Sequence, residues 1–101
     1  MEPRSCDRYL AWMPIQSFAC RETERLFTTG RTTRFVNVKA TAERRLAQLD
    51  AAPAVEFMRR PPGNDMKWYD GAWHVRINDQ WRLIFRWSED GPIDVAIKDP
   101  H

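Results

Sequence analysis

The spacing of hydrophobic residues changes abruptly in the middle of this chain, and this change restricts the fold more than any other feature. Before position 61, the clearest apolar stripe repeats every three or four residues, at Phe35, Val38, Ala42, Leu46 and Leu49. This spacing predicts the buried face of an amphipathic helix. After position 64, hydrophobic residues occupy alternate positions, which is typical of a half-buried β-strand. We therefore expect helices first and a sheet afterwards.

Two further elements and one break are expected in the first part of the chain. Residues 15–18 alternate and predict a short strand, and residues 20–27 predict a short helix that Gly30 ends. Pro61-Pro62-Gly63-Asn64 must be a loop, because two adjacent prolines remove backbone hydrogen-bond donors and cannot continue a helix.

The alternating part of the chain predicts three strands joined by turns. The first two strands form a hairpin that turns at residues 78–80, and Asp90-Gly91-Pro92 turns the chain into a last strand with Ile93, Val95 and Ile97. The expected order is β-α-α-β-β-β. This is an α+β fold, in which a helical hairpin packs on one face of a mainly antiparallel sheet.

The alternation also divides the side chains of the hairpin between two faces. The apolar face, expected to contact the helices, consists of Trp73, Val75, Ile77, Trp81, Leu83, Phe85 and Trp87. The opposite face then carries His74, Arg76, Arg82 and Arg86. Charged residues are common on a solvated sheet face, but several arginines together also suit phosphate oxygens, because the guanidinium group is planar and always charged. Arg76 and Arg86 are therefore candidate RNA-binding residues.

The sequence ends in a group that can transfer protons. Lys98-Asp99-Pro100-His101 directly follows the expected last strand. A terminal histidine is most often an ordinary surface residue, but an imidazole with a pKa near 6.5 can also exchange a proton at cellular pH. Whether His101 would act as an acid or as a base stays open at this point.

Cations and aromatic rings occur together just before the hairpin. Lys67 is followed by Trp68 and Tyr69 in what we expect to be a loop. Exposed rings beside a cation can stack on unpaired RNA bases, although the same rings can equally pack against the sheet edge. Arg44 and Arg45 are helix-face charges by default, and they are also candidates for contact with a large RNA.

Composition excludes several classes of protein. The net charge is +2, from 16 basic and 14 acidic side chains, which argues against indiscriminate coating of nucleic acid. Cys6 and Cys20 are too few for a disulfide scaffold and form no Cys/His cluster for a metal. No apolar stretch is long enough to cross a membrane, and no signal peptide is recognisable, so we expect a cytoplasmic protein. Residues 1–12 are expected to be an extension or an alternative-start tail before a domain of residues 13–101.

Four segments and the last tripeptide match a known family when they are taken together. They are Ile-Gln-Ser-Phe at 15–18, the helix-forming residues 42–52, Pro-Pro-Gly-Asn at 61–64, the run Val-Arg-Ile-Asn-Asp-Gln-Trp-Arg-Leu-Ile-Phe at 75–85, and Asp-Pro-His at 99–101. These segments resemble the HigB toxins of bacterial type II toxin–antitoxin modules, in the RelE/ParE superfamily. The resemblance covers about residues 13–101.

The resemblance implies a toxin that enters the ribosomal A site and cleaves mRNA during translation, without a metal ion or other cofactor. It also implies a HigA-like helix-turn-helix antitoxin as partner, and DNA contact only through that complex. Carried over by position, the catalytic residues of the family fall on Lys67, Arg82, Asp99 and His101. Arg82, with Arg76 and Lys67, would stabilise charge on the phosphate. His101 would transfer a proton, and Asp99 would orient it or share that role.

The sequence departs from the family pattern at the expected site. Pro100 occupies the position where the family usually has tyrosine, Lys67 a position often held by histidine, and Asp70 that of a second lysine. These departures predict a weak nuclease. They also leave two alternatives: a ParE-like toxin that inhibits gyrase or another target by binding, and an inert protein that only binds the antitoxin. Arg82 and His101 discriminate among the three, because only cleavage requires both.

Overall fold

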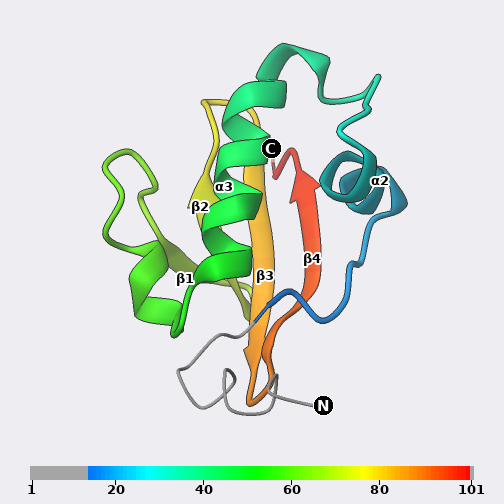
Figure 1. Ribbon diagram of the computed structural model, residues 1–101. Coiled ribbons are helices and arrows are strands. Elements are labelled where there is room, and N and C mark those ends of the chain that lie inside the picture. Colours follow the sequence, from blue (N-terminus) through cyan, green and yellow to red (C-terminus); the bar gives the residue numbers. More distant parts are fainter. Residues whose placement is uncertain (1–13, 101) are drawn as a thin grey trace, which may run out of the picture.

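The structure is a computed structural model that describes residues 14–100, with two helices and four strands (Figure 1). The helices are α2 (Arg21–Thr29) and α3 (Lys39–Ala51), and the strands are β1 (Lys67–Tyr69), β2 (Ala72–Arg76), β3 (Arg82–Ser88) and β4 (Gly91–Lys98). Short 3₁₀ turns occupy Val36–Val38 and Val55–Met58. The tail predicted for residues 1–12, the domain start at Met13 and the catalytic candidate His101 all lie outside the described residues.

The predicted α+β class is confirmed, with helices on one side of an antiparallel sheet. Strand order in the sheet is β1-β2-β3-β4, so strands that follow one another in sequence are hydrogen-bonded neighbours. α3 lies across the sheet in front of β3, and α2 lies beside β4 (Figure 1). Gly30, with a φ of 75°, ends α2 as predicted. One face of the sheet is therefore covered, and the other is available for a site.

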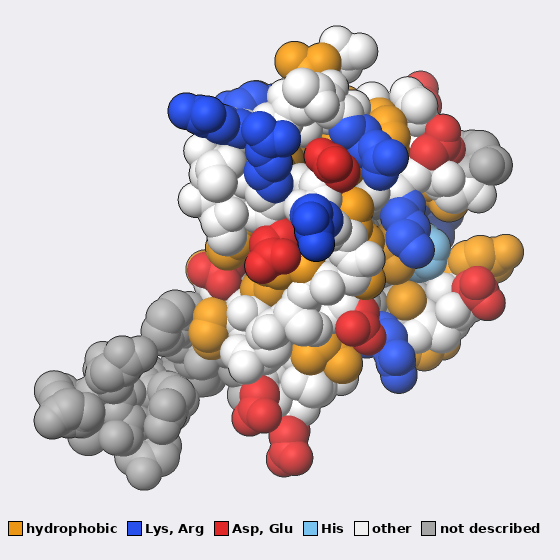
Figure 2. Space-filling model, turned by 90° about the vertical axis from the view of Figure 1, so that its right-hand side faces the viewer, with side chains coloured by type: hydrophobic (Ala, Val, Ile, Leu, Met, Phe, Trp, Pro, Cys, Tyr) orange, Lys and Arg blue, Asp and Glu red, His pale blue; other side chains and the backbone are white. Residues whose placement is uncertain are grey.

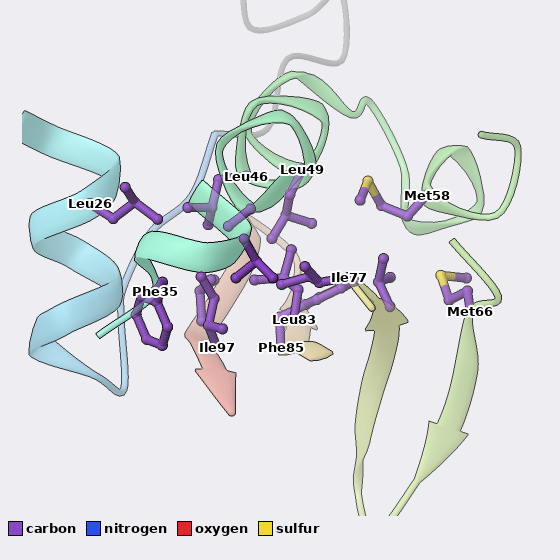
Figure 3. Close-up of a cluster of buried hydrophobic side chains, with 14 of the residues drawn as sticks. Leu26, Phe35, Leu46, Leu49, Met58, Met66, Ile77, Leu83, Phe85 and Ile97 are labelled. Carbon is purple, nitrogen blue, oxygen red and sulfur yellow. The ribbon is translucent and has the colours of Figure 1, made fainter. Parts of the chain in front are cut away.

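The predicted apolar stripe forms the helical side of the core. Phe35, Ala42, Leu46 and Leu49 are fully buried, and Val38 is 8% exposed. They meet the alternating residues of the sheet, of which Val75, Leu83, Phe85 and Ile97 are buried, in one cluster (Figure 3). The burial of this apolar surface is the main force that holds the helical layer on the sheet. The stripe begins before the helix does, because its first two members precede α3.

The prediction of a first strand at residues 15–18 is wrong, because this segment makes only a single parallel bridge. Phe18 pairs with Val95 of β4. Next to it, Asp94 has a φ of 55°, a left-handed conformation that interrupts a regular ladder. The Asp94 N–H donates to the Ser17 side-chain oxygen at 2.8 Å instead of to a backbone carbonyl. The segment lies along β4 without extending the sheet.

The prediction of a loop at residues 67–69 is also wrong, because these residues form the edge strand β1. Lys67 is paired with His74 of β2, and the two strands are joined at Asp70 and Gly71. Both joining residues have positive φ, 53° and 80°, as a type I′ hairpin turn requires. The Asp-Gly dipeptide that signals such a turn is present in the sequence. As a result, the sheet places a lysine directly beside the histidine of β2.

The predicted turn between β2 and β3 is confirmed. The Asn78 side-chain oxygen accepts the backbone N–H groups of Gln80 and Trp81, at 2.9 and 2.7 Å. This local side-chain bond stabilises the tight connection. It thereby holds Arg76 opposite Arg82 at the end of the hairpin.

Candidate functional site

The sheet face opposite the helices carries cationic side chains in adjacent rows. The strand register places Arg76 opposite Arg82, and Arg82 opposite Lys98. It also places Lys67 opposite His74. Paired residues in a sheet project to the same side, so these five side chains share one face, which we call the open face. The predicted division of the hairpin into an apolar and a cationic face is consistent with this register.

Three predicted site residues line one hollow on the open face. This Arg82 hollow, of about 330 Å³, is lined by Lys67, Trp68, Tyr69, His74, Arg82 and Pro100. Arg82 is half-buried, and its Nη1 atom is buried with no hydrogen-bond partner among the described residues. A buried donor without an acceptor is costly. The guanidinium group therefore has unused capacity for the oxygens of an anion.

A second hollow, of about 560 Å³, adjoins the first and is lined by the predicted residues Arg86 and Asp99. Tyr69, His74 and Pro100 line both hollows. We call it the Arg86 hollow. In it, Arg86 Nη1 lies 3.5 Å from a carboxylate oxygen of Asp94, and Asp99 accepts a hydrogen bond of 3.3 Å from the Gln80 side chain. The hollow thus has mixed charge and is less cationic than the first.

Lys67 is held only loosely beside the Arg82 hollow. Its ammonium nitrogen lies 3.6 Å from the Asp65 carboxylate, and its side chain is 63% exposed. An exposed ion pair of this kind contributes little to stability, so it restrains the lysine weakly. The Lys67 side chain can therefore turn toward a phosphate without a large loss of free energy.

The C-terminal end of the described chain reaches both hollows. Pro100 borders each of them, and His101 is the next residue along the chain. The tyrosine that Pro100 replaces in the family pattern is absent, but Tyr69 brings a different phenol to the same place. Its ring contacts that of His74 edge-on, with centroids 5.6 Å apart. A phenol is thus present at the site, on β1 instead of at the C-terminus.

His74 is the site residue that the sequence-based assignment left out. It is 9% exposed and lies at the junction of the two hollows. Burial is the main cause that lowers its pKa, and the charge of Arg82 acts in the same direction. A hydrogen bond to the Tyr69 backbone and the charge of Asp70 oppose this shift in part. The alternation of β2 had placed this histidine on the cationic face, but only its arginine neighbours suggested a function.

The lowered pKa of His74 predicts a specific loss of stability in acid. An unfolded histidine binds a proton near pH 6.5, and the folded protein binds it only at lower pH, so protonation opposes folding. This contribution to stability is present above pH 6.5 and is lost as the pH falls through the folded pKa. We expect the wild-type protein to lose more unfolding free energy below pH 6.5 than His74→Gln. Urea unfolding at several pH values on both sides of 6.5 measures the difference; a constant difference would contradict the assignment.

The aromatic residues of β1 are open to contact. Trp68 and Tyr69 are 59% and 67% exposed. The Trp68 ring meets Trp73 edge-on at 5.0 Å between centroids, so one side of it is packed and the other is free. Of the two alternatives given for these rings, packing against the sheet edge is therefore only partial, and both retain surface for stacking on a base.

Three of the predicted RNA-binding residues lie outside the hollows. Arg76 forms an ion pair with Asp79 on the open face. Arg44 is exposed on α3, in the layer that covers the other face. Arg45 is 8% exposed, and its Nε donates to the Arg76 carbonyl at 3.1 Å, so it has a structural contact and little free surface. The structure does not bring these residues to the hollows, and their RNA contacts stay predictions.

Charge is dispersed over the part of the surface seen in Figure 2. Several Lys and Arg side chains adjoin one another at the upper left, and the others are separated by acidic, apolar and uncharged groups, so no single basic area covers this view. A third hollow, at residues 36–43, has Lys39 and Glu43 as its charged groups, and these two pair with each other at 3.1 Å. The lysine of this third hollow is thus already paired with a carboxylate. The Arg82 hollow, in contrast, has a cationic side chain with an unpaired donor among the described residues.

Within residues 14–100, no group of three or more His, Cys, Asp or Glu side chains is arranged to hold a metal ion. In the same part of the chain, no helix has the length and apolar character needed to span a bilayer.

The fold and the sequence comparisons agree on the class of protein. Two helices on a four-stranded antiparallel sheet are consistent with RelE-like toxins, and a family model for the RelE-like toxin HigB of type II toxin–antitoxin systems matches residues 16–101. The chain belongs to this HigB-like toxin family. The resemblance identified from the sequence is thereby confirmed.

A curated relative supports the same assignment. Toxin HigB-1 of Vibrio cholerae serotype O1 is 40% identical over 62 residues. This match covers 57% of the present chain and 64% of the relative. The match thus extends over a little less than two thirds of the length of that toxin.

Proposed function

We propose that this protein is the toxin of a type II toxin–antitoxin module and that it cleaves mRNA on the translating ribosome without a metal ion. The observation that carries the proposal is the Arg82 hollow. It combines a half-buried arginine, one of whose nitrogens has no hydrogen-bond partner among the described residues, with an exposed lysine, and it is bordered by the residue before His101.

The chemistry follows from what these side chains can do. In RNA cleavage, the 2′-oxygen attacks the adjacent phosphorus, and negative charge develops on the phosphate oxygens. Arg82 and Lys67 would stabilise that charge, because both are cationic and border the same hollow. His101 would transfer a proton and Asp99 would orient it, as carried over from the family. The ribosome would supply much of the rate by holding the mRNA in line for attack.

The surroundings of the hollow are suited to a flexible RNA. Trp68 is exposed on the edge strand and would stack on an unpaired base. Arg86 and Arg76 lie on the same face and would contact the RNA backbone. Arg44, which is exposed on α3, would contact ribosomal RNA from the helical layer, whereas Arg45 is buried against the Arg76 carbonyl and has little surface for such a contact.

For partners, we propose a HigA-like helix-turn-helix antitoxin that binds the helical layer and the sheet edge. Contact with DNA would occur only through that complex. Such a toxin would act in the cytoplasm, where translating ribosomes are found. Co-purification with an adjacent helix-turn-helix protein tests the partner.

The activity itself is tested by mapping mRNA ends. We expect induced expression to stop growth and to produce new mRNA 5′ ends inside translated regions, detectable by primer extension. The His101→Ala variant, expressed at the same level, should restore growth and remove these ends, because it deletes the proposed proton-transfer group. Growth arrest with intact mRNA would overturn the proposal.

A second function is favoured by one observation, the proline at position 100. Pro100 lies next to both hollows, at the position where the family pattern has a tyrosine, so the phenol of that tyrosine is missing. A toxin that inhibits its target by binding, in the manner of the ParE branch, would not need that group. In this case His101→Ala would remain toxic. An inert antitoxin-binding protein would not stop growth at all.

A further inference from the structure

His74 is a buried titratable group at the centre of the site for which the mechanism above has no use. It belongs to β2, which is hydrogen-bonded to β1 on one side and to β3 on the other. A side chain on such a central strand is held in a fixed position, which favours a catalytic role. It lines both hollows.

We propose that His74 is a catalytic residue of this toxin and acts as the general base that takes the proton of the attacking 2′-hydroxyl. The proposal rests on the nuclease function proposed above. The sequence left open whether His101 acts as an acid or as a base. In this proposal His74 is the base that removes a proton at the start, and His101 is the acid that donates one at the end.

The position of His74 relative to the phosphate-binding cations supports this role. Lys67 is directly opposite it on β1. On β3, its partner is Ile84, and Arg82 is two residues before that partner, so Arg82 is its diagonal neighbour on the open face. A phosphate bound between Lys67 and Arg82 in their shared hollow is adjacent to the imidazole. The 2′-hydroxyl of the same nucleotide then lies within reach of a ring nitrogen.

Burial, together with the nearby charge of Arg82, favours the neutral form of the imidazole. The charged or titratable groups that line the hollows with it come from β1 and its turn, from β3, and from β4 with the residue after it: Lys67, Tyr69, Asp70, Arg82, Arg86, Asp94, Lys98 and Asp99. Burial and the nearby guanidinium of Arg82 prevail, and the pKa of His74 lies below 6.5. At cellular pH the ring is therefore neutral, and a neutral imidazole accepts a proton.

The neutral ring has a nitrogen that can act as the base. In neutral imidazole, one nitrogen carries the proton and the other has a free lone pair. The nitrogen without a proton is the one that would accept the proton of the 2′-hydroxyl.

The step balances as follows. The 2′-hydroxyl gives its proton to the free nitrogen of His74, while its oxygen forms a bond to phosphorus. The bond from phosphorus to the 5′-oxygen of the next nucleotide breaks, and that oxygen takes its electron pair and receives a proton from the His101 imidazolium. The products are a 2′,3′-cyclic phosphate and a free 5′-hydroxyl. Arg82 stays positively charged throughout and stabilises the pentacovalent phosphate.

The test compares wild-type protein, His74→Gln and a matched Glu89→Gln control on programmed ribosomes, under single-turnover conditions and over a range of pH. Glu89 is exposed in the turn after β3, away from both hollows. We expect His74→Gln to cleave about 10²-fold more slowly or worse, and Glu89→Gln to cleave like wild type. The wild-type rate should fall as the pH drops below 6.5, and this fall should be absent from the variant.

Two further measurements separate a base from a structural residue. Thermal unfolding of His74→Gln, and of His74→Asn as a second variant, identifies any loss of folding. Added imidazole should restore part of the cleavage by His74→Ala, because the small base can enter the vacated space.

Three results would overturn the role of His74. Cleavage by a folded His74→Gln at the wild-type rate would do so while leaving the nuclease function intact. A slower variant with an unchanged pH profile would show that the residue only supports the site. No mRNA cleavage by the wild-type protein would instead remove the proposed nuclease function, and the inference with it.

Discussion

Replacing Arg82 with alanine is expected to lower the rate of mRNA cleavage on ribosomes by about 10²- to 10³-fold, the usual effect of removing one preorganised donor to a developing oxyanion. Arg82 is half-buried, and one of its donors has no partner within residues 14–100, so its charge is less screened than that of an exposed cation. Its loss should reduce kcat/KM chiefly through kcat, because the interaction strengthens as charge develops on the phosphate. Single-turnover cleavage of a programmed ribosome complex measures this effect.

Two control variants determine whether the effect depends on position. Arg82→Lys keeps the charge but loses the planar fork, so an intermediate rate is expected. Arg25→Ala removes one positive charge from the exposed side of α2 and should change cleavage little. Equal losses for Arg82→Ala and Arg25→Ala would mean that the protein needs only overall positive charge to bind its target. If Arg82→Ala were fully active, Arg82 would not be a catalytic residue.

The parts of the fold that the sequence predicted correctly depend on periodicity. In the helical stripe, Leu46 and Leu49 are buried because residues three and four apart lie on one side of a helix. On the sheet, Val75 and Leu83 are buried because alternate residues of a strand point to one side. The open face followed from the same alternation, and so Arg82 could be placed there from sequence.

The elements that were predicted wrongly depend on pairing with another segment of the chain. Strand β1 has three residues, all exposed, and it is a strand because β2 supplies the hydrogen-bond partners. In β4, the register passes from Ala96 opposite Ile84 to Ile93 opposite Arg86, so the two residues between them in β4 face a single residue of β3. This bulge moves Ile93 to the same side as Arg86. Simple alternation along β4 cannot predict such an insertion, because it arises from pairing with β3 and from the contact with Ser17.

Burial explains why two polar residues were assessed incompletely from sequence. In sequence, His74 and Arg45 both look like exposed polar residues of an amphipathic element. In the structure, each is less than 10% exposed, His74 between two hollows and Arg45 bonded to the backbone of Arg76. Burial is the main reason that the pKa of His74 is lowered, and the charge of Arg82, its neighbour in the folded sheet, adds to it. Composition and spacing do not contain this information.

The second large effect is expected in the core that supports the site. Leu46 is fully buried on α3 and faces the sheet (Figure 3), so Leu46→Ala would leave a cavity between the layers and lower the free energy of unfolding by about 2–5 kcal/mol. This is a large part of the roughly 5–15 kcal/mol typical of a small domain. Urea unfolding measures the loss. The control Val36→Ala, at a residue that is 60% exposed, should change the free energy of unfolding by less than about 0.5 kcal/mol.

Because Leu46 lines neither hollow, the fraction of Leu46→Ala that remains folded should cleave mRNA at the wild-type rate. If the two variants were equally stable, α3 would not be packed on the sheet as described, and the open face would lose its structural support.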